Sequence, residues 1–270
     1  MMNIAPNMVY GPAGLVGFQM ISQSPALALV AFNDPARANA MTRTMAQDFS
    51  AVVGGLKEAG PEAIVVTGTG RTFSAGGDME MIRQKQSQPA KQNSSEMYDF
   101  YRSFLGILDL KVPVVAAING AAIGAGLCFA CACDRRIAAY IDGNILGFSF
   151  AKLGLTPGMG GTIFPRRLVG DEEADRMLAE AYNITPRRAF EIGMVEMVAP
   201  RKMLLDYAIL AAMRLAAKPK AAFRKRLGWH ELKLQLTEEA RLQGASFLTG
   251  EHLRKYELFI RDLNGRRAIP

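Results

Sequence analysis

The chain carries Phe73-Ser74-Ala75-Gly76-Gly77-Asp78 and Asn119-Gly120-Ala121-Ala122-Ile123-Gly124-Ala125-Gly126, two glycine-rich turns that each follow a short β-rich run. A backbone that presents its N–H to a ligand needs left-handed or crowded conformations, which a Cβ opposes and glycine allows. Two such turns can aim two N–H groups at one point. Preorganised donors in a dry pocket stabilise a carbonyl oxygen most when negative charge develops on it. The pair therefore predicts an oxyanion hole of the kind that acyl-thioester chemistry needs.

The second turn leads into an apolar, alanine-rich stretch over 127–133 that predicts a buried helix. In that case the Ala125 N–H lies in the first helical turn, where it has no intrahelical partner and where the helix dipole adds positive potential. Either turn alone is more typical of an ordinary connection between a strand and a helix. Together, the two turns favour the oxyanion hole.

Length and composition indicate one large α/β domain with an appendage. The chain has 270 residues, of which 50% are hydrophobic, so it can bury a full core. Residues 1–200 alternate between β-rich and helical patterns, and we expect them to form the core. Residues 201–270 carry long amphipathic runs and predict a C-terminal helical segment.

The formal net charge is +7, and the basic clusters lie mainly in the second half of the chain. No aromatic-interleaved basic stripe accompanies them, which argues against a nucleic-acid partner. Scattered basic groups suit the phosphates of coenzyme A or of a phosphopantetheine arm on an acidic carrier protein. Solvated helix faces explain most of these charges equally well.

The three cysteines, Cys128, Cys131 and Cys133, lie within six residues of an apolar pattern. An odd, clustered set in a predicted helix indicates reduced core thiols rather than a disulfide framework. A metal site is not expected either, because Cys-x-x-Cys occurs once and the two histidines lie far along the chain. No apolar run reaches the length of a membrane span, so the composition predicts a soluble, cytoplasmic protein without a membrane partner.

The pattern before the second turn has a βαβ order. Residues 16–20 and 27–32 predict a hairpin, residues 42–56 a helix that begins at a capping threonine, and residues 63–67 a buried strand. The polar stretch from Gln84 to Ser95 has few apolar anchors. We therefore expect it to be a mobile loop near the mouth of the site.

Five segments together resemble the crotonase (enoyl-CoA hydratase/isomerase) superfamily in their order and spacing. They are Arg37-Ala38-Asn39-Ala40-Met41, the two glycine-rich turns, Cys133-Asp134, and the stretch from Gly154 to Thr162. The resemblance covers about residues 15–215 and is specific as a set. It implies an α/β fold built as a spiral of ββα units, with a C-terminal helical segment that packs into homotrimers or hexamers.

The resemblance also implies an acyl-thioester substrate, with coenzyme A or phosphopantetheine as part of that substrate and no separate cofactor. By position, the two oxyanion donors are the N–H groups of Ala75 and Ala125. An acyl carrier protein is a possible partner. The substrate neighbours implied by position around the two turns are Arg37, Ala38, Gly76, Asp78 and Gly124.

The chain departs from the family pattern at the positions of two catalytic carboxylates. Family hydratases carry one glutamate three residues after the second oxyanion donor and another seven residues before the proline of the Pro-Gly-x-Gly-Gly turn. Here those positions hold Cys128 and Phe150. General acid–base catalysis typically contributes a factor of about 10²–10⁴, so ordinary hydration is not expected. An oxyanion hole alone can still stabilise an enolate.

Two alternatives to an isomerase-like enzyme follow from this departure. The turn from Leu155 to Gly160 resembles that of decarboxylases that act on a methylglutaconyl thioester in polyketide β-branching. Decarboxylation yields an enolate and needs no strong base, only a proton donor afterwards. The other alternative is a degenerate member that binds an acyl thioester without converting it.

Each candidate group for proton transfer also has an explanation without a catalytic role. Glu80 follows Asp78 closely and is either a base or a solvated carboxylate. Tyr98 is either a proton donor or a packing residue, and His230 is either a donor across a trimer interface or an exposed helix residue. Cys128 either contacts substrate or behaves as a small hydrophobe. Apolar residues that predict a pocket wall excluding water are Phe148, Phe150 and Met159.

Overall fold

The chain forms two sheets, seen in the computed structural model, which describes residues 7–143, 145–218 and 229–255. The predicted hairpin is present, because β2 (Val16–Gln23) and β3 (Ala26–Phe32) pair antiparallel, with β1 (Val9–Tyr10) on the outer edge. Parallel strands extend the sheet in the order β1-β2-β3-β4-β6-β8-β11. They are β4 (Ala63–Gly68), β6 (Val114–Ile118), β8 (Arg135–Ala139) and β11 (Met197–Ala199).

The second sheet is smaller and has the order β10-β9-β7-β5. Its strands are β5 (Thr72–Ser74), β7 (Ala121–Ile123), β9 (Leu146–Gly147) and β10 (Asn183–Ile184). The consecutive strands β4 and β5, β6 and β7, and β8 and β9 each place one strand in the large sheet and the next in the small sheet. Helical segments follow each pair. This repetition confirms the predicted spiral of ββα units.

Helices begin and end where capping residues and glycines allow. The helix α1 (Arg43–Ala59) begins after Thr42, whose hydroxyl accepts a hydrogen bond from the Met45 N–H at 3.0 Å, and ends at Gly60 in a left-handed conformation. The remaining helices are α2 (Met79–Gln84), α3 (Ala90–Leu105), α4 (Ala125–Ala132), α5 (Phe164–Val169), α6 (Asp171–Glu180), α7 (Pro186–Glu191), α8 (Leu204–Ala216) and α9 (Trp229–Ser246).

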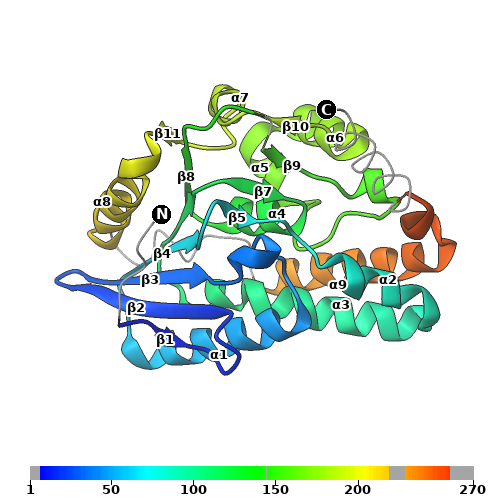
Figure 1. The fold of residues 1–270 in the computed structure, drawn as a ribbon, viewed down its shortest axis with the longest axis horizontal. Helices are drawn as coiled ribbons and strands as arrows, with labels where there is room; N and C mark the ends of the chain where they lie inside the picture. Colours follow the sequence, from blue (N-terminus) through cyan, green and yellow to red (C-terminus); the bar gives the residue numbers. More distant parts are fainter. Residues whose placement is uncertain (1–6, 144, 219–228, 256–270) are drawn as a thin grey trace, which may run out of the picture.

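The large sheet is covered on both faces. One face packs on α8, where Ala208 and Ala212 allow close approach to β4 and β6. The other face contributes to the main core with α1, α3, α4 and the small sheet, around aromatic rings that include Phe32, Phe49 and Phe129. In Figure 1, α3 and α9 lie side by side and α8 stands apart from them. The helix α9 thus packs against α3, next to the first half of the fold.

The prediction of a mobile loop from Gln84 to Ser95 is wrong. The helix α2 ends at Gln84, a short 3₁₀ turn spans Lys85–Ser87, and α3 begins at Ala90. The buried Asn93 amide donates to the Lys85 carbonyl at 2.8 Å, and the Lys85 ammonium, 1% exposed, pairs with Glu96. Polar side chains anchor this segment through internal hydrogen bonds, which a search for apolar anchors does not detect.

All three cysteines are free and buried, as predicted. Within the described ranges, none of the helices has the length and apolar character needed to cross a membrane.

Candidate active site

Three parallel strands of the small sheet bring the site together. The strands β5, β7 and β9 point the same way, so the segments that follow them meet at one edge. A pocket of about 500 Å³ lies there, closed by α2, α3 and one side chain of α9. Its apolar lining consists of Met79, Met81, Ile82, Met97, Phe100, Ile123, Phe150, Leu153 and Leu155, and its polar side chains are Arg37, Asp78, Tyr101, Ser149, Lys152 and Gln243.

The first glycine-rich turn lies beside Met41, and this contact sets the direction of its amides. The Met41 N–H donates to the Gly76 carbonyl at 2.7 Å, and the Asp78 N–H donates to the Met41 carbonyl at 3.2 Å. Gly77, between these two hydrogen bonds, lines the pocket. Among the described residues its N–H has no acceptor. The Gly77 N–H is therefore available to a ligand.

The second turn presents an amide at the start of a helix. Gly124 has a φ of 53°, and its N–H donates to the Gly147 carbonyl at 2.8 Å. Ala125 is the first residue of α4 and lines the pocket. Its N–H has no intrahelical acceptor and no other one within the described residues. The Ala125 amide is therefore a free donor in the pocket lining, at the positive end of the α4 dipole.

The two turns touch at Gly76. A Cβ added there would lie 2.4 Å from the Ile123 carbonyl oxygen and 3.3 Å from the Ala125 nitrogen, and its φ is 85°. Only glycine fits that approach. The two free amides, of Gly77 and Ala125, consequently belong to neighbouring pieces of backbone.

Ala75 lines the pocket, but its N–H donates to the Ala38 carbonyl at 3.0 Å. An amide that already has this partner is not free for an oxyanion, which argues against the predicted role of Ala75. Three consecutive amides, those of Ala75, Gly76 and Gly77, fit the sequence pattern equally. The Ala38 carbonyl engages the Ala75 N–H and the Ser74 hydroxyl accepts the Gly76 N–H at 3.1 Å, so within the described residues Gly77 is the one of the three with a free N–H.

The mouth of the pocket is polar. The Arg37 guanidinium pairs with the Asp78 carboxylate at 2.7 Å, and the other Asp78 oxygen accepts the Met81 N–H at the start of α2. Lys152 lines the same pocket and is exposed. Arg37 and Asp78 thus lie where they are predicted, while Ala38 and Gly76 contribute backbone atoms next to the pocket rather than lining it.

The two positions at which the family resemblance implies catalytic carboxylates lie in different surroundings. Phe150 lines the pocket, whereas Cys128 is fully buried behind it. Burial raises the pKa of the Cys128 thiol well above its ordinary value, so the thiol stays neutral. Phe148 and Met159 are also fully buried and are not among the lining residues. Of the predicted apolar wall, Phe150 alone reaches the pocket.

The predicted proton-transfer groups do not meet in this pocket. The Glu80 carboxylate is exposed and forms two hydrogen bonds with Arg83, at 2.8 and 2.7 Å. These bonds lower its pKa to about 2, which makes it a poor base. Tyr98 is half-buried against the core and does not line the pocket.

His230 is exposed near the start of α9, and Gln243 is the α9 residue that reaches the pocket. Their separation of thirteen positions corresponds to about 20 Å along a helix. In the described part of the chain, no three histidine, cysteine, aspartate or glutamate side chains lie close enough together to hold a metal ion.

Sequence reasoning missed the contribution of α9 to the site. The Tyr101 hydroxyl donates to the Gln243 side-chain oxygen, and the Gln243 amide donates to the Thr156 carbonyl at 2.7 Å. One turn earlier, the buried Glu239 carboxylate accepts the N–H groups of Gly160 and Thr162 at 2.7 and 2.8 Å. A signal existed, because both polar residues interrupt the buried face that Leu232, Leu236 and Ala240 define at helical spacing.

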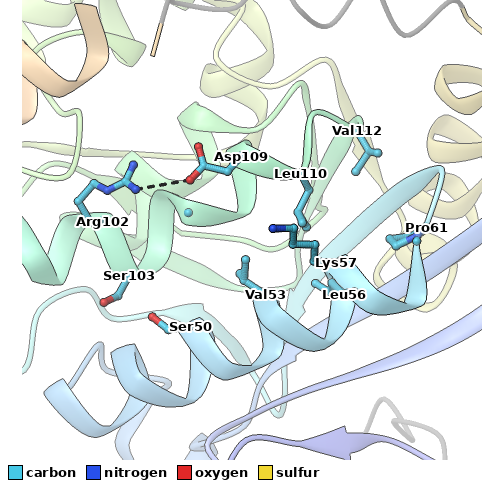
Figure 2. Close-up of a pocket in the computed structure, with 12 residues that line it drawn as sticks. Ser50, Val53, Leu56, Lys57, Pro61, Arg102, Ser103, Asp109, Leu110 and Val112 are labelled. Carbon is cyan, nitrogen blue, oxygen red and sulfur yellow. Dashed lines mark ion pairs between the residues drawn. The ribbon is translucent and has the colours of Figure 1, made fainter. Parts of the chain in front are cut away.

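A second pocket, of about 430 Å³, lies between the end of α1 and the segment after α3 (Figure 2). The Arg102–Asp109 ion pair, at 3.5 Å, and Lys57 border it. None of the predicted site residues line it, and it shares no lining residue with the first pocket.

Comparison with known proteins agrees with this architecture. The family model described as enoyl-CoA hydratase/isomerase matches residues 22–255. A probable enoyl-CoA hydratase, EchA14, from Mycobacterium tuberculosis is 36% identical over 208 residues, covering 76% of this chain and 77% of the relative. The putative enoyl-CoA hydratase/isomerase YngF of Bacillus subtilis is 34% identical over 203 residues, which cover 74% of this chain and 75% of the relative.

A crystal structure of an enoyl-CoA hydratase from Bacillus halodurans has the same fold, with a TM-score of 0.77, 22% identity, and coverage of 90% of this chain and 99% of that one. The match of the family model over most of the chain, together with these relatives, identifies its membership. The chain belongs to the enoyl-CoA hydratase/isomerase family, within the crotonase superfamily.

Proposed function

We propose that this protein binds an acyl thioester with its carbonyl oxygen between the N–H groups of Gly77 and Ala125, and that it stabilises the enolate formed there. The observation that carries the proposal is the meeting of two acceptor-free amides at the wall of one apolar pocket. Developing negative charge on the oxygen strengthens both hydrogen bonds in a site from which water is largely excluded. The thioester handle is coenzyme A or a phosphopantetheine arm, with Arg37 and Lys152 near its phosphates at the mouth.

The reaction that we favour is an enolate reaction other than standard hydration. Hydration needs groups that position water and move a proton, and the two positions implied for them by the family resemblance hold the buried Cys128 and the apolar Phe150. Glu80 does not replace them, because its carboxylate is bonded to Arg83 outside the pocket lining. Decarboxylation of a methylglutaconyl-type thioester forms the enolate by loss of carbon dioxide and needs no base, only a proton donor afterwards. Isomerisation needs one group that removes and returns a proton, but no positioned water.

The test is a mass spectrum of the thioester after incubation with purified protein, using crotonyl-CoA and 3-methylglutaconyl-CoA separately. Loss of carbon dioxide from the second compound supports decarboxylation. Gain of water by crotonyl-CoA at a hydratase-like rate would overturn the exclusion of hydration. Isomerisation leaves the mass unchanged, so the double-bond position is checked by proton NMR. Binding of both compounds, measured by calorimetry, with neither a change in mass nor a shift of the double bond would instead favour a degenerate member that holds its ligand.

We also propose that the protein assembles as a homotrimer or hexamer. Exposed apolar side chains on α9 and just after it, Leu234, Leu242 and Leu248, support such an interface. Sedimentation equilibrium would then give three or six times the chain mass of 29.3 kDa. In a trimer His230 could approach another subunit, whereas within one chain it lies far from the pocket.

A further inference from the structure

The side chain of Ser149 lies in the wall of the active-site pocket, just after β9. Ser149 is half-buried and lines the pocket. Gly147, the last residue of β9, lies opposite Ile123, the last residue of β7, and its carbonyl accepts the Gly124 N–H at 2.8 Å. Because β7 and β9 run parallel, the residues after Gly147 continue beside the turn that carries the Ala125 amide. Ser149 is the second of these residues.

The conformation of Gly124 shows where the Ala125 N–H points. Gly124 has a φ of 53° and a ψ of −121°. At this ψ, the Cα–Cβ bond of an L residue would eclipse the C–N bond to Ala125, so its Cβ would lie about 2.7 Å from the Ala125 nitrogen, on the side of the hydrogen. An oxygen that accepts this N–H at about 2.9 Å would lie about 2.4 Å from the same point. The open Cβ position of Gly124 therefore marks the place of the thioester oxygen.

The Ser149 hydroxyl lies beside this position. Its oxygen is 3.3 Å from the Cβ position of Gly124, and no other described atom outside Gly124 and its chain neighbours comes within 4 Å. The hydroxyl oxygen and a bound thioester oxygen would thus surround one point and lie less than about 6 Å apart. Rotation between the staggered positions of the short serine side chain can close the remaining gap.

The proton of the Ser149 hydroxyl is available to a ligand. Within the described ranges, no hydrogen bond occupies this hydroxyl. The other hydroxyl in the pocket lining, that of Tyr101, donates to the side-chain oxygen of Gln243, whose NH₂ group binds the Thr156 carbonyl. Of the two hydroxyls that line the pocket, Ser149 is therefore the one that can donate to a substrate.

We propose that Ser149 is a catalytic residue that donates a third hydrogen bond to the thioester oxygen held by Gly77 and Ala125. The inference rests on the proposed function, because it requires a thioester carbonyl at these two amides. It goes further because a side chain, and not the backbone alone, then forms the oxyanion hole. The hydrogen bond strengthens as the oxygen gains the negative charge of the enolate, so it stabilises the transition state more than the bound substrate.

The experiment compares the infrared carbonyl band of butyryl-CoA, labelled with ¹³C at the carbonyl, in the unaltered protein and in Ser149→Ala. Calorimetry gives the dissociation constants, so that both spectra are recorded at saturation. Loss of one neutral hydrogen bond should weaken binding by about threefold to tenfold. The band of the ligand bound to Ser149→Ala should shift less from its frequency in water than the band in the unaltered protein.

Two further substitutions test whether the hydroxyl itself is responsible. Ser149→Thr keeps the hydroxyl and should retain most of the band shift. Ser149→Cys replaces it with a weak donor of similar shape and should give an intermediate shift, which decides the question if Ser149→Ala does not fold. Ser103→Ala is the matched control, because the Ser103 hydroxyl donates to the Asp99 carbonyl at 2.9 Å and Ser103 lines the second pocket. This control should leave both the band and the dissociation constant unchanged.

Kinetics separates a catalytic role from a packing role. For whichever thioester the protein converts, Ser149→Ala should lower kcat by about 10²-fold or more, the typical effect of losing one oxyanion donor. This factor exceeds the expected loss of affinity, because the hydrogen bond is strongest in the transition state. Equal losses in Ser149→Ala and Ser103→Ala would contradict the role of Ser149.

The outcomes also distinguish this inference from the proposed function. A band shift that Ser149→Ala retains in full at saturation would overturn the third hydrogen bond and leave the two amides in place. Absence of binding, or a bound ligand without any band shift in the unaltered protein, would contradict the proposed thioester site itself.

Discussion

At the scale of single residues, the site depends on the absence of a side chain at Gly76. Gly76 lies so close to the Ile123 carbonyl and the Ala125 amide that any side chain would push the two turns apart. The neighbouring Gly77 amide is free because Met41 binds the backbone atoms on both sides of it. Neither residue contributes a side chain to the site. Gly76 allows the two turns to approach each other, and Gly77 supplies its backbone N–H.

Gly76→Ala should therefore lower kcat for whichever thioester the protein converts by about 10²-fold or more, the typical effect of losing one oxyanion donor. A positive φ of 85° adds backbone strain to the clash. Steady-state kinetics measures the effect. Gly54→Ala is the matched control, because an added Cβ on this exposed α1 residue meets nothing within 4 Å.

The control variant Gly54→Ala should itself differ slightly from the unaltered protein. Alanine is favoured over glycine inside a helix by roughly 0.5–1 kcal/mol, so Gly54→Ala should be slightly more stable and equally active. Unchanged turnover in Gly76→Ala would show that the approach of the two turns is not needed for catalysis.

At the scale of elements, α9 holds in place the glycine-rich stretch from Gly154 to Thr162. The Glu239 carboxylate is buried and accepts two backbone N–H groups and the Thr162 hydroxyl of that turn, while Gln243 binds Thr156. Gly158, between these anchors, lines the pocket. A helix from the end of the chain thus sets the shape of a turn that lies about 80 residues earlier in the sequence.

Glu239→Gln should destabilise the fold by about 1–3 kcal/mol, because the amide brings an NH₂ group to a place where three donors already point. Thermal or urea unfolding measures this change. Glu238→Gln is the matched control, since the exposed Glu238 pairs with Arg241 on the surface of α9, and surface substitutions usually change stability by at most about 0.5 kcal/mol. Equal stability of the two variants would contradict the anchoring role of Glu239.

The segment after α9 contains a pH-sensitive residue. His252 is 1% exposed and packs edge-on against Phe247, with ring centroids 5.5 Å apart. Burial lowers its pKa from the ordinary value of 6.5. Between the lowered pKa of His252 in the folded state and its ordinary value of 6.5, the unfolded chain binds more protons than the folded chain. The free energy of unfolding therefore decreases as the pH falls below 6.5.

His252→Leu should remove this dependence. The contribution of one histidine is at most about 1.4 kcal/mol per pH unit, and it is fully present above pH 6.5. Urea unfolding at pH 7.5 and at pH 5.5 should give a smaller difference for His252→Leu than for the unaltered protein. The quantity compared is the change in the free energy of unfolding between the two pH values, so the test holds even when the substitution alters stability at both. The same change in both proteins would show that the pKa of His252 does not differ between the folded and unfolded states.

At the scale of the whole molecule, the sequence was informative where interactions are local. Apolar runs identified the main strands, the threonine cap identified the start of α1, and the glycine-rich turns marked the edge at which β5, β7 and β9 converge. The family pattern then supplied the ββα spiral. These features depend on neighbouring residues and on side-chain periodicity, which one sequence displays directly.

Long-range contacts account for what was missed. The Ala75 amide is not free because it donates to the Ala38 carbonyl, and Lys85 and Glu96 anchor the segment around Asn93. Tyr101 and Gln243 meet across 142 residues of sequence. None of these pairs has a local signature beyond a polar residue on an otherwise apolar helix face.

If the two amides polarise a thioester carbonyl, isotope-edited infrared spectroscopy detects the weakened C=O bond. The measurement compares butyryl-CoA labelled with ¹³C at the carbonyl, free and bound, for the unaltered protein and for Ala125→Pro. Proline at the first helical position removes this N–H where the helix does not use it. We expect the carbonyl band of the bound ligand to shift to lower frequency, and Ala125→Pro to lose much of that shift while it remains folded. A bound ligand whose carbonyl band stays at its frequency in water, or a shift that Ala125→Pro retains in full, would contradict the oxyanion hole.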